Sequence, residues 1–81
     1  MLIAIEGHRT DRVIRTLSGL SEVASIHTTN GRWDLVVEVG ADTLEQFDAV
    51  LNRIRLIQGV TNSETNILLT TPRATRIRRV A

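Results

Sequence analysis

The sequence predicts an α+β fold in which four strands and two helices follow the order βαββαβ. Three observations support this prediction. Two segments, residues 13–20 and 44–57, place apolar residues along one face of a helix. Runs rich in aliphatic and β-branched residues lie before, between and after these segments. An Asn30-Gly31 pair separates the two middle runs and favours a hairpin, because both residues tolerate positive φ angles.

The first strand and helix are expected within the first twenty residues. Residues 1–5 form a short apolar run suited to a strand buried on both faces. A helix is predicted over residues 9–18, with Thr10 as its N-cap and Gly19 just after its end. Its apolar stripe consists of Val13, Ile14, Leu17 and Leu20.

The next two strands are predicted at residues 23–29 and 33–39. In the second of these, alternate residues point to opposite faces. One face carries Trp33, Leu35, Val37 and Val39, and the other carries Asp34, Val36 and Glu38. The first face should pack on helices, and the second is only half polar.

The second helix is expected to start at Asp42 as N-cap, with Glu45 reaching back in a capping box. Gly59 is predicted to end it. A last strand is predicted over residues 60–70, with its strongest signal at residues 67–69. Right-handed crossovers then give a ferredoxin-like sandwich, a four-stranded antiparallel sheet with both helices on one face. The uncovered sheet face predicts dimerisation through the sheet.

Composition narrows the function classes. The 81-residue chain has no cysteine and two histidines, so disulfides and most zinc sites are not expected, and no cofactor is predicted. A domain this small usually needs a partner chain when it has no disulfide or metal. There is no apolar run of membrane-spanning length and no signal-peptide pattern, so we expect a cytoplasmic protein.

Charge divides the chain into two parts at Pro72. Residues 1–72 hold six arginines and nine acidic residues, and residues 73–81 hold four arginines and no acid. We therefore expect a domain at 1–72 and a basic tail at 73–81. The tail either contacts nucleic acid or an acidic surface, or is a solvated terminus.

Three segments carry a resemblance to a known family. They are residues 13–23, the loop Gly31-Arg-Trp-Asp34, and Gly59-Val60 followed by Ser63-Glu-Thr65. This series resembles the effector-binding RAM domain of the Lrp/AsnC family of regulators, over residues 1–72. Full regulators of that family carry an N-terminal helix-turn-helix DNA-binding domain. Here the sequence starts at the first strand, so we expect a stand-alone RAM domain, with an excised domain as the alternative.

The resemblance implies a non-catalytic regulatory module that binds an amino acid or similar small molecule. RAM domains form homodimers through their sheets, and the dimers assemble into rings such as octamers. The ligand lies between dimers, in a pocket built from the hairpin loop and from the last strand of a neighbour. The matching residues here are Gly31, Arg32, Trp33, Asp34, Ser63, Glu64 and Thr65. The resemblance also implies a role in transcription regulation or amino-acid metabolism, and contact with full-length Lrp/AsnC regulators.

The chemistry of these residues suits an α-amino acid. Asp34 could accept hydrogen bonds from an ammonium group, and backbone N–H groups near Gly31 could approach a carboxylate. The hydroxyl groups of Ser63 and Thr65 could form hydrogen bonds to either the ammonium or the carboxylate of the amino acid. Trp33 could form an apolar wall.

Each residue also has a structural explanation. Gly31 fits the hairpin turn, Asp34 could pair with Arg32 or stabilise the turn, and Trp33 could anchor an interface or the core. The residues at 63–65 are ordinary strand residues. Arg32 replaces residues that are commonly aromatic or acidic in the family, which favours an acidic or polar ligand, or a closed pocket.

Two other function classes fit the predicted fold. A small dimeric ferredoxin-like enzyme of the monooxygenase or isomerase type would need a group such as His27 in an apolar cavity. A structural module would co-assemble with full-length regulators without a ligand. An RNA-recognition domain shares the element order, but Trp33 alone does not supply its stacking aromatics.

Overall fold

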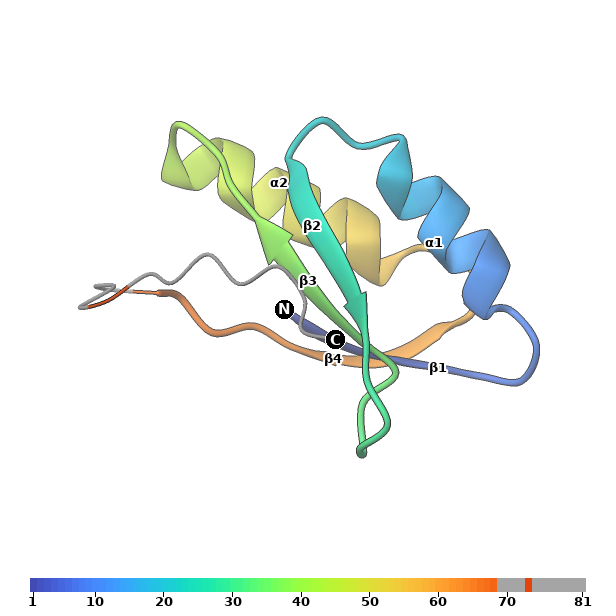
Figure 1. Cartoon of the computed structure of the whole chain (residues 1–81). Coiled ribbons are helices and arrows are strands. Elements are labelled where there is room, and N and C mark those ends of the chain that lie inside the picture. Colours follow the sequence, from blue (N-terminus) through green and yellow to red (C-terminus); the bar gives the residue numbers. More distant parts are fainter. Residues whose placement is uncertain (69–72, 74–81) are drawn as a thin grey trace.

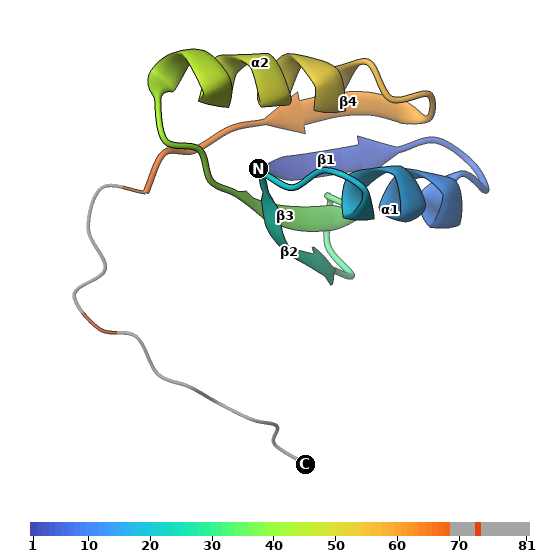
Figure 2. The ribbon, with the colours of Figure 1, turned by 90° about the horizontal axis from the view of Figure 1, so that it is seen from above.

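The computed structural model describes residues 1–68 and residue 73. The elements follow the predicted order: β1 (Leu2–Ile5), α1 (Thr10–Ser18), β2 (Val23–Thr28), β3 (Leu35–Val39), α2 (Leu44–Arg55) and β4 (Val60–Glu64). Neighbouring strands are antiparallel, in the order β2-β3-β1-β4, which Figure 2 shows from bottom to top. The predicted ferredoxin-like α+β fold is confirmed.

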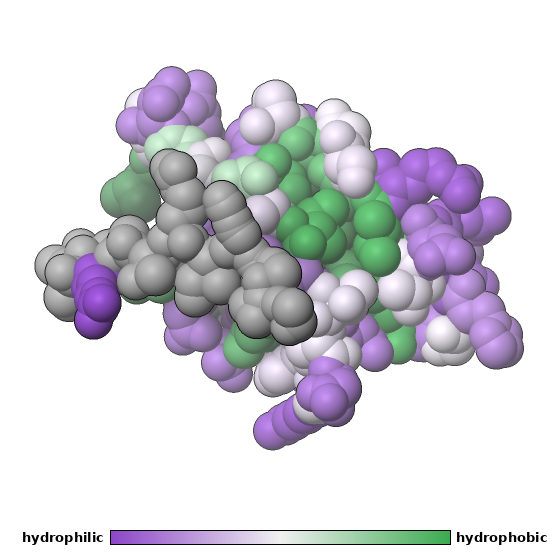
Figure 3. Space-filling model, viewed as in Figure 1, coloured by the Kyte–Doolittle hydropathy of each residue, from purple (hydrophilic) through white to green (hydrophobic). Residues whose placement is uncertain are grey.

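The core lies between the sheet and the two helices, which share one face of the sheet (Figure 1). Its fully buried side chains come from the strands and from both helices: Ile3, Leu35 and Val37, then Val13 and Leu17, then Val50 and Ile54. The helical stripes read from the sequence therefore form the buried faces, except at Leu44, the first residue of the second stripe, which is 74% exposed. Figure 3 shows apolar side chains reaching the surface along the margin between β2 and α1. Ile14 of α1 and Ile26 of β2 are partly buried and pack against the core.

Within the part of the chain that the structure describes, the other face of the sheet carries no helix. Because Ile3 and Val37 point into the core, their neighbours Leu2 and Val36 point to this open face, where they pair across β1 and β3. Ala4 and His27 share the same face by register. Leu2, Ala4 and Val36 are half-buried within one chain, so the centre of the open face is apolar.

The start of α1 corrects a sequence-based expectation. Thr10 is the first residue of the helix and not its N-cap; Arg9 holds that position and makes no side-chain capping bond. The Arg9 carbonyl already accepts the first helical hydrogen bond, from Val13 N–H at 2.9 Å, so the helix begins one residue earlier than predicted. Arg9 also lies against Gly59, where an added Cβ would stand 2.9 Å from Arg9 Cβ. Gly59 has a φ of 109° and lies past the end of α2, whose C-cap is Leu56, so Gly59 does not end the helix as predicted. Gly19 is the C-cap of α1, as predicted.

The N-cap of α2 lies one residue later than the sequence suggests, and the predicted capping box is not formed. Thr43 is the N-cap, in an extended conformation, and its hydroxyl accepts a hydrogen bond from Gln46 N–H at 3.1 Å. Gln46 Oε1 in turn accepts from Asp42 N–H at 3.2 Å. The sequence-based prediction of Asp42 as N-cap and Glu45 as its partner is therefore wrong by one residue, because Asp42 precedes the N-cap.

The last strand is shorter than predicted. It ends at Glu64, which pairs with Leu2, the first residue of β1. Ile67 and Leu68 lie beyond that register and are largely exposed, so these two residues of the predicted strand have no β1 partner. The remainder of the predicted strand, residues 69–70, and the domain boundary at Pro72 lie outside the described residues.

Candidate functional site

The loop between β2 and β3, which projects from the end of the sheet in Figure 1, contains four of the predicted site residues. Thr29 organises this loop. Its hydroxyl donates to the Trp33 carbonyl at 2.6 Å and accepts from Gly31 N–H at 3.2 Å. Its backbone N–H donates to the Asp34 carbonyl at 3.1 Å. Thr29 was missed by the sequence reasoning, because a threonine at a strand end carries no signal of its own.

Gly31 occupies this loop without using a glycine-only conformation. In the described chain only Gly7 and Gly59 have positive φ among the glycines, so the positive φ expected at Gly31 is wrong, although the predicted hairpin between β2 and β3 forms. The reason is loop length: the Thr29 N–H closes the loop on Asp34, six residues from end to end, and a two-residue turn is not needed. A Cβ added at Gly31 would come no closer than 3.9 Å to any other atom considered.

Asp34 ties the loop to β1. Its carboxylate Oδ2 accepts a hydrogen bond from Ile5 N–H at 2.7 Å, and its own N–H donates to the Ile3 carbonyl at 2.9 Å. This agrees with the interpretation of Asp34 as a turn stabiliser. The other carboxylate oxygen of Asp34 has no partner in the described part of the chain.

Arg32 stacks on the neighbouring indole. The guanidinium carbon lies 5.7 Å from the centroid of the Trp33 ring, within cation–π range. Arg32 forms no ion pair with a carboxylate of the described residues, so the alternative in which Asp34 pairs with Arg32 is not observed. Trp33 is half-buried and Arg32 is exposed. A positive charge thus stands beside an apolar surface at the tip of the loop.

The remaining predicted site residues lie on β4 and just after it. Ser63 is opposite Ile3 and Glu64 is opposite Leu2. The Thr65 hydroxyl accepts a long hydrogen bond of 3.5 Å from Arg55, and Asn66 donates to the Glu64 carboxylate at 3.3 Å. These polar groups are therefore held by local contacts.

One chain does not bring the two groups of predicted site residues together. Asp34 bonds to β1 from its β3 side, through Ile3 and Ile5. Ser63 and Glu64 pair with β1 from its β4 side, opposite Ile3 and Leu2. β1 therefore lies between the two groups, and two strand spacings, roughly 10 Å, separate their backbones.

An apolar groove of about 820 Å³ lies at the start of β1, between the end of β3, the start of α2 and the segment after β4. Its lining includes Leu44, Phe47, Ile67 and Leu68, and Thr65 is the one predicted site residue that borders it. Burial lowers the pKa of the Met1 amino group at this groove, while the Glu38 carboxylate acts in the opposite direction. The sequence reasoning missed the groove because it assigned the apolar residues 67–69 to a paired strand.

The described residues show few features of a metal site, of the alternative enzyme site at His27 or of a membrane-spanning segment. Residues 1–68 and 73 contain no group of three metal-ligating side chains. His27 is exposed on the open face and contacts the Ser25 hydroxyl at 3.2 Å, outside the helix-covered core. Within the same residues, neither helix has the length and apolar character needed to cross a membrane.

Comparison with protein families gives one match. The model of the Lrp/AsnC ligand binding domain matches residues 1–77, nearly the whole chain, and includes both groups of predicted site residues. No curated protein matches the chain. The match agrees with the element order, the sheet topology and the resemblance of the loop and strand motifs. The chain therefore belongs to the Lrp/AsnC ligand binding domain family, whose domains are regulatory and bind small molecules.

Proposed function

We propose that this chain is a non-catalytic module that senses an amino acid and acts in transcription regulation or amino-acid metabolism. The observation that carries the proposal is the separation of the two groups of predicted site residues in a chain of this ligand-binding family. Two half-sites on opposite sides of one strand can form one pocket when different subunits supply them.

The hairpin loop supplies groups for both ends of an amino acid. The free Asp34 oxygen accepts a hydrogen bond from the ligand ammonium, in a charge-assisted contact. The Gly31 N–H is already used by Thr29, so the carboxylate binds instead to the backbone N–H groups of Arg32 and Trp33 and to the Arg32 guanidinium. Those two N–H groups have no partner in the described chain. Ser63, Glu64 and Thr65 of a neighbouring subunit complete the pocket.

The assembly uses the surfaces that one chain leaves open. The apolar centre of the open sheet face at Leu2, Ala4 and Val36 joins two chains into a homodimer. Dimers then join into a ring such as an octamer, in which hairpin loops meet β4 segments of neighbours. Full-length Lrp/AsnC regulators are the expected partners through the same contacts, because their ligand-binding domains share this fold.

Isothermal titration calorimetry against the twenty amino acids tests the proposal. We expect at least one amino acid to bind, and to stabilise the fold by about 2.7 kcal/mol at 100 times its Kd. Asp34→Asn keeps an oxygen that accepts from Ile5 N–H but removes the charge, so it should weaken binding about tenfold or more. Asp48→Asn, an exposed acid on α2, is the control and should bind as wild type does.

Absence of heat and of thermal stabilisation across the whole panel at millimolar ligand would argue against amino-acid sensing. It would favour a structural module that co-assembles without a ligand. Unchanged ligand affinity in Asp34→Asn would instead show that the hairpin loop is not part of the ligand site.

A further inference from the structure

A second hollow, of about 840 Å³, lies on the side of α2 that faces the turn between α1 and β2. We call it the polar hollow. Its lining residues come from that turn, from the loop after β3 and from α2: Ser21, Glu22, Gly40, Ala41, Asp42, Gln46, Ala49 and Arg53. All of them belong to one chain, and none is among the predicted ligand-binding residues. The hollow is therefore complete without a second subunit.

One wall of the polar hollow is a single stripe of α2 and its approach. Asp42, Gln46, Ala49 and Arg53 follow one another at steps of four, three and four residues, which places them on one side of the helix. The opposite wall is the Ser21–Glu22 turn. Small residues between the walls, Gly40, Ala41 and Ala49, leave room for a ligand.

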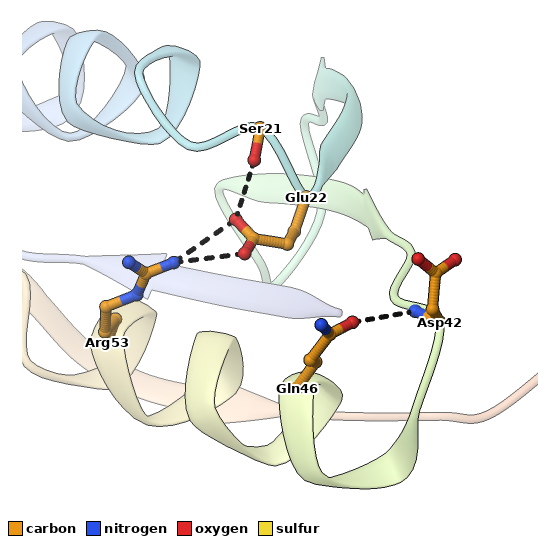
Figure 4. Close-up of polar contacts among 5 residues, drawn as sticks. All are labelled: Ser21, Glu22, Asp42, Gln46 and Arg53. Carbon is orange, nitrogen blue, oxygen red and sulfur yellow. Dashed lines mark hydrogen bonds and ion pairs between the residues drawn. The ribbon is translucent and has the colours of Figure 1, made fainter.

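Polar contacts hold both walls in place (Figure 4). Arg53 Nη2 donates to both carboxylate oxygens of Glu22, at 3.2 and 3.3 Å, and the Ser21 hydroxyl donates to Glu22 Oε1 at 3.4 Å. The Glu22 carbonyl accepts from Gly40 N–H at 2.9 Å. The Glu22 side chain is only 27% exposed, so its charge is fixed at the wall.

Several polar groups in the polar hollow remain available. Figure 4 shows the Asp42 carboxylate directed away from Gln46, although the Asp42 N–H bonds to the Gln46 side-chain oxygen. That carboxylate has no partner in the described chain, and neither do the Gln46 amide nitrogen and the Nε and Nη1 atoms of Arg53. Two carboxylates and one guanidinium give the hollow a net charge of −1.

We propose that the polar hollow binds a small amine of net charge +1 that also carries a carboxylate, as a diamino acid does. One ammonium group lies against Asp42 and the other beside Glu22. The ligand carboxylate accepts hydrogen bonds from the free donors of Arg53 and Gln46, which are charge-assisted contacts. This site needs no partner subunit, so it is independent of the ligand site proposed above.

The test is an NMR titration of the ¹⁵N-labelled chain with three probes: L-lysine, L-norleucine and 6-aminohexanoic acid. The last two each lack one ammonium group of L-lysine. We expect L-lysine to shift the amide resonances of Gly40, Ala41 and Gln46, and to bind about tenfold more tightly than either analogue. Equal affinity for the three probes, or L-lysine shifts that avoid these residues, would overturn the proposal.

Two matched variants assign the site. Asp42→Asn removes the charge, keeps the N–H that bonds Gln46, and should weaken L-lysine binding about tenfold. Asp48→Asn removes an acid of α2 that does not line the hollow and should have no effect. Unchanged binding in Asp42→Asn contradicts the proposal.

A third variant separates this inference from the proposed function. L-lysine binding that is lost in Asp34→Asn but kept in Asp42→Asn belongs to the hairpin loop, which overturns the inference and supports the proposed function. Binding that is lost in Asp42→Asn supports the inference, whether or not any amino acid binds at the hairpin loop.

Discussion

Thr29 determines the shape of the hairpin loop through hydrogen bonds to Gly31, Trp33 and Asp34. Thr29→Val keeps the side-chain volume and removes the hydroxyl, so Trp33 should become more exposed. We expect a red-shifted Trp33 emission and stronger acrylamide quenching, with a stability loss of about 1 kcal/mol or less because the loop is solvated. Trp33 is the only tryptophan, so the signal is unambiguous.

Thr29→Ser is the matched control for this prediction. It retains the hydroxyl and should give the emission and quenching of the wild-type chain. An emission spectrum of Thr29→Val that matches wild type would show that the hydroxyl does not shape the loop.

Glycine is required at position 59 but not at position 31. Gly59 combines a φ of 109° with atoms of Arg9 and Val13 at 2.9–3.2 Å from an added Cβ. Gly59→Ala should therefore cost roughly 2 kcal/mol or more in the free energy of unfolding. Gly31→Ala should change it by less than about 1 kcal/mol. Urea unfolding measures both, and a larger loss in Gly31→Ala would contradict this account.

Gly31→Ala also addresses the glycine's role in binding. An affinity loss without a stability loss would indicate that the ligand approaches the loop backbone closely at this position.

At the scale of elements, the N-cap of α2 distinguishes two neighbouring polar residues. Thr43→Ala removes the hydroxyl that accepts from Gln46 N–H and should cost about 1 kcal/mol. Asp42→Ala removes a carboxylate that caps nothing and should change stability by less than about 0.5 kcal/mol. Chemical denaturation of both variants measures these losses. A larger stability loss in Asp42→Ala than in Thr43→Ala would indicate that Asp42 is the N-cap, as the sequence predicts.

Element type and order could be predicted from the sequence because they depend on local periodicity. The stripes of α1 and α2 became the core faces, and the alternation in β3 placed Leu35 and Val37 inside. Element ends could not be predicted, since they depend on partners. The register of β1 ends β4 at Glu64, and the approach of the chain decides between Asp42 and Thr43 as cap.

The candidate sites differ in how much the sequence could predict. The motif residues were located from the sequence, but their separation across β1 follows from sheet order, which no single motif contains. The polar hollow joins Glu22 to Arg53, residues 31 apart, so no spacing rule indicates it. The hydrogen bond from Ile5 to Asp34 is equally non-local.

At the scale of the whole molecule, the open sheet face should determine association. Val36 lies at the centre of that face beside Leu2, so Val36→Lys should place an unpaired charge in the dimer contact. We expect light scattering to show dissociation to monomers, with the circular dichroism of the fold retained. Gln58→Lys, an exposed change away from this face, should leave the assembly intact. An unchanged mass for Val36→Lys would exclude this face as the dimer contact.

The central claim is that one ligand site is built from two subunits, and subunit mixing tests it most directly. Asp34→Asn disables the hairpin half-site, and Thr65→Val disables the β4 half-site by removing its hydroxyl. Each variant alone should bind the amino acid identified by calorimetry weakly. After co-refolding at equal amounts, about a quarter of the sites should regain wild-type affinity, because each site draws its halves from different chains. No recovery on mixing, with each variant defective alone, would contradict the account.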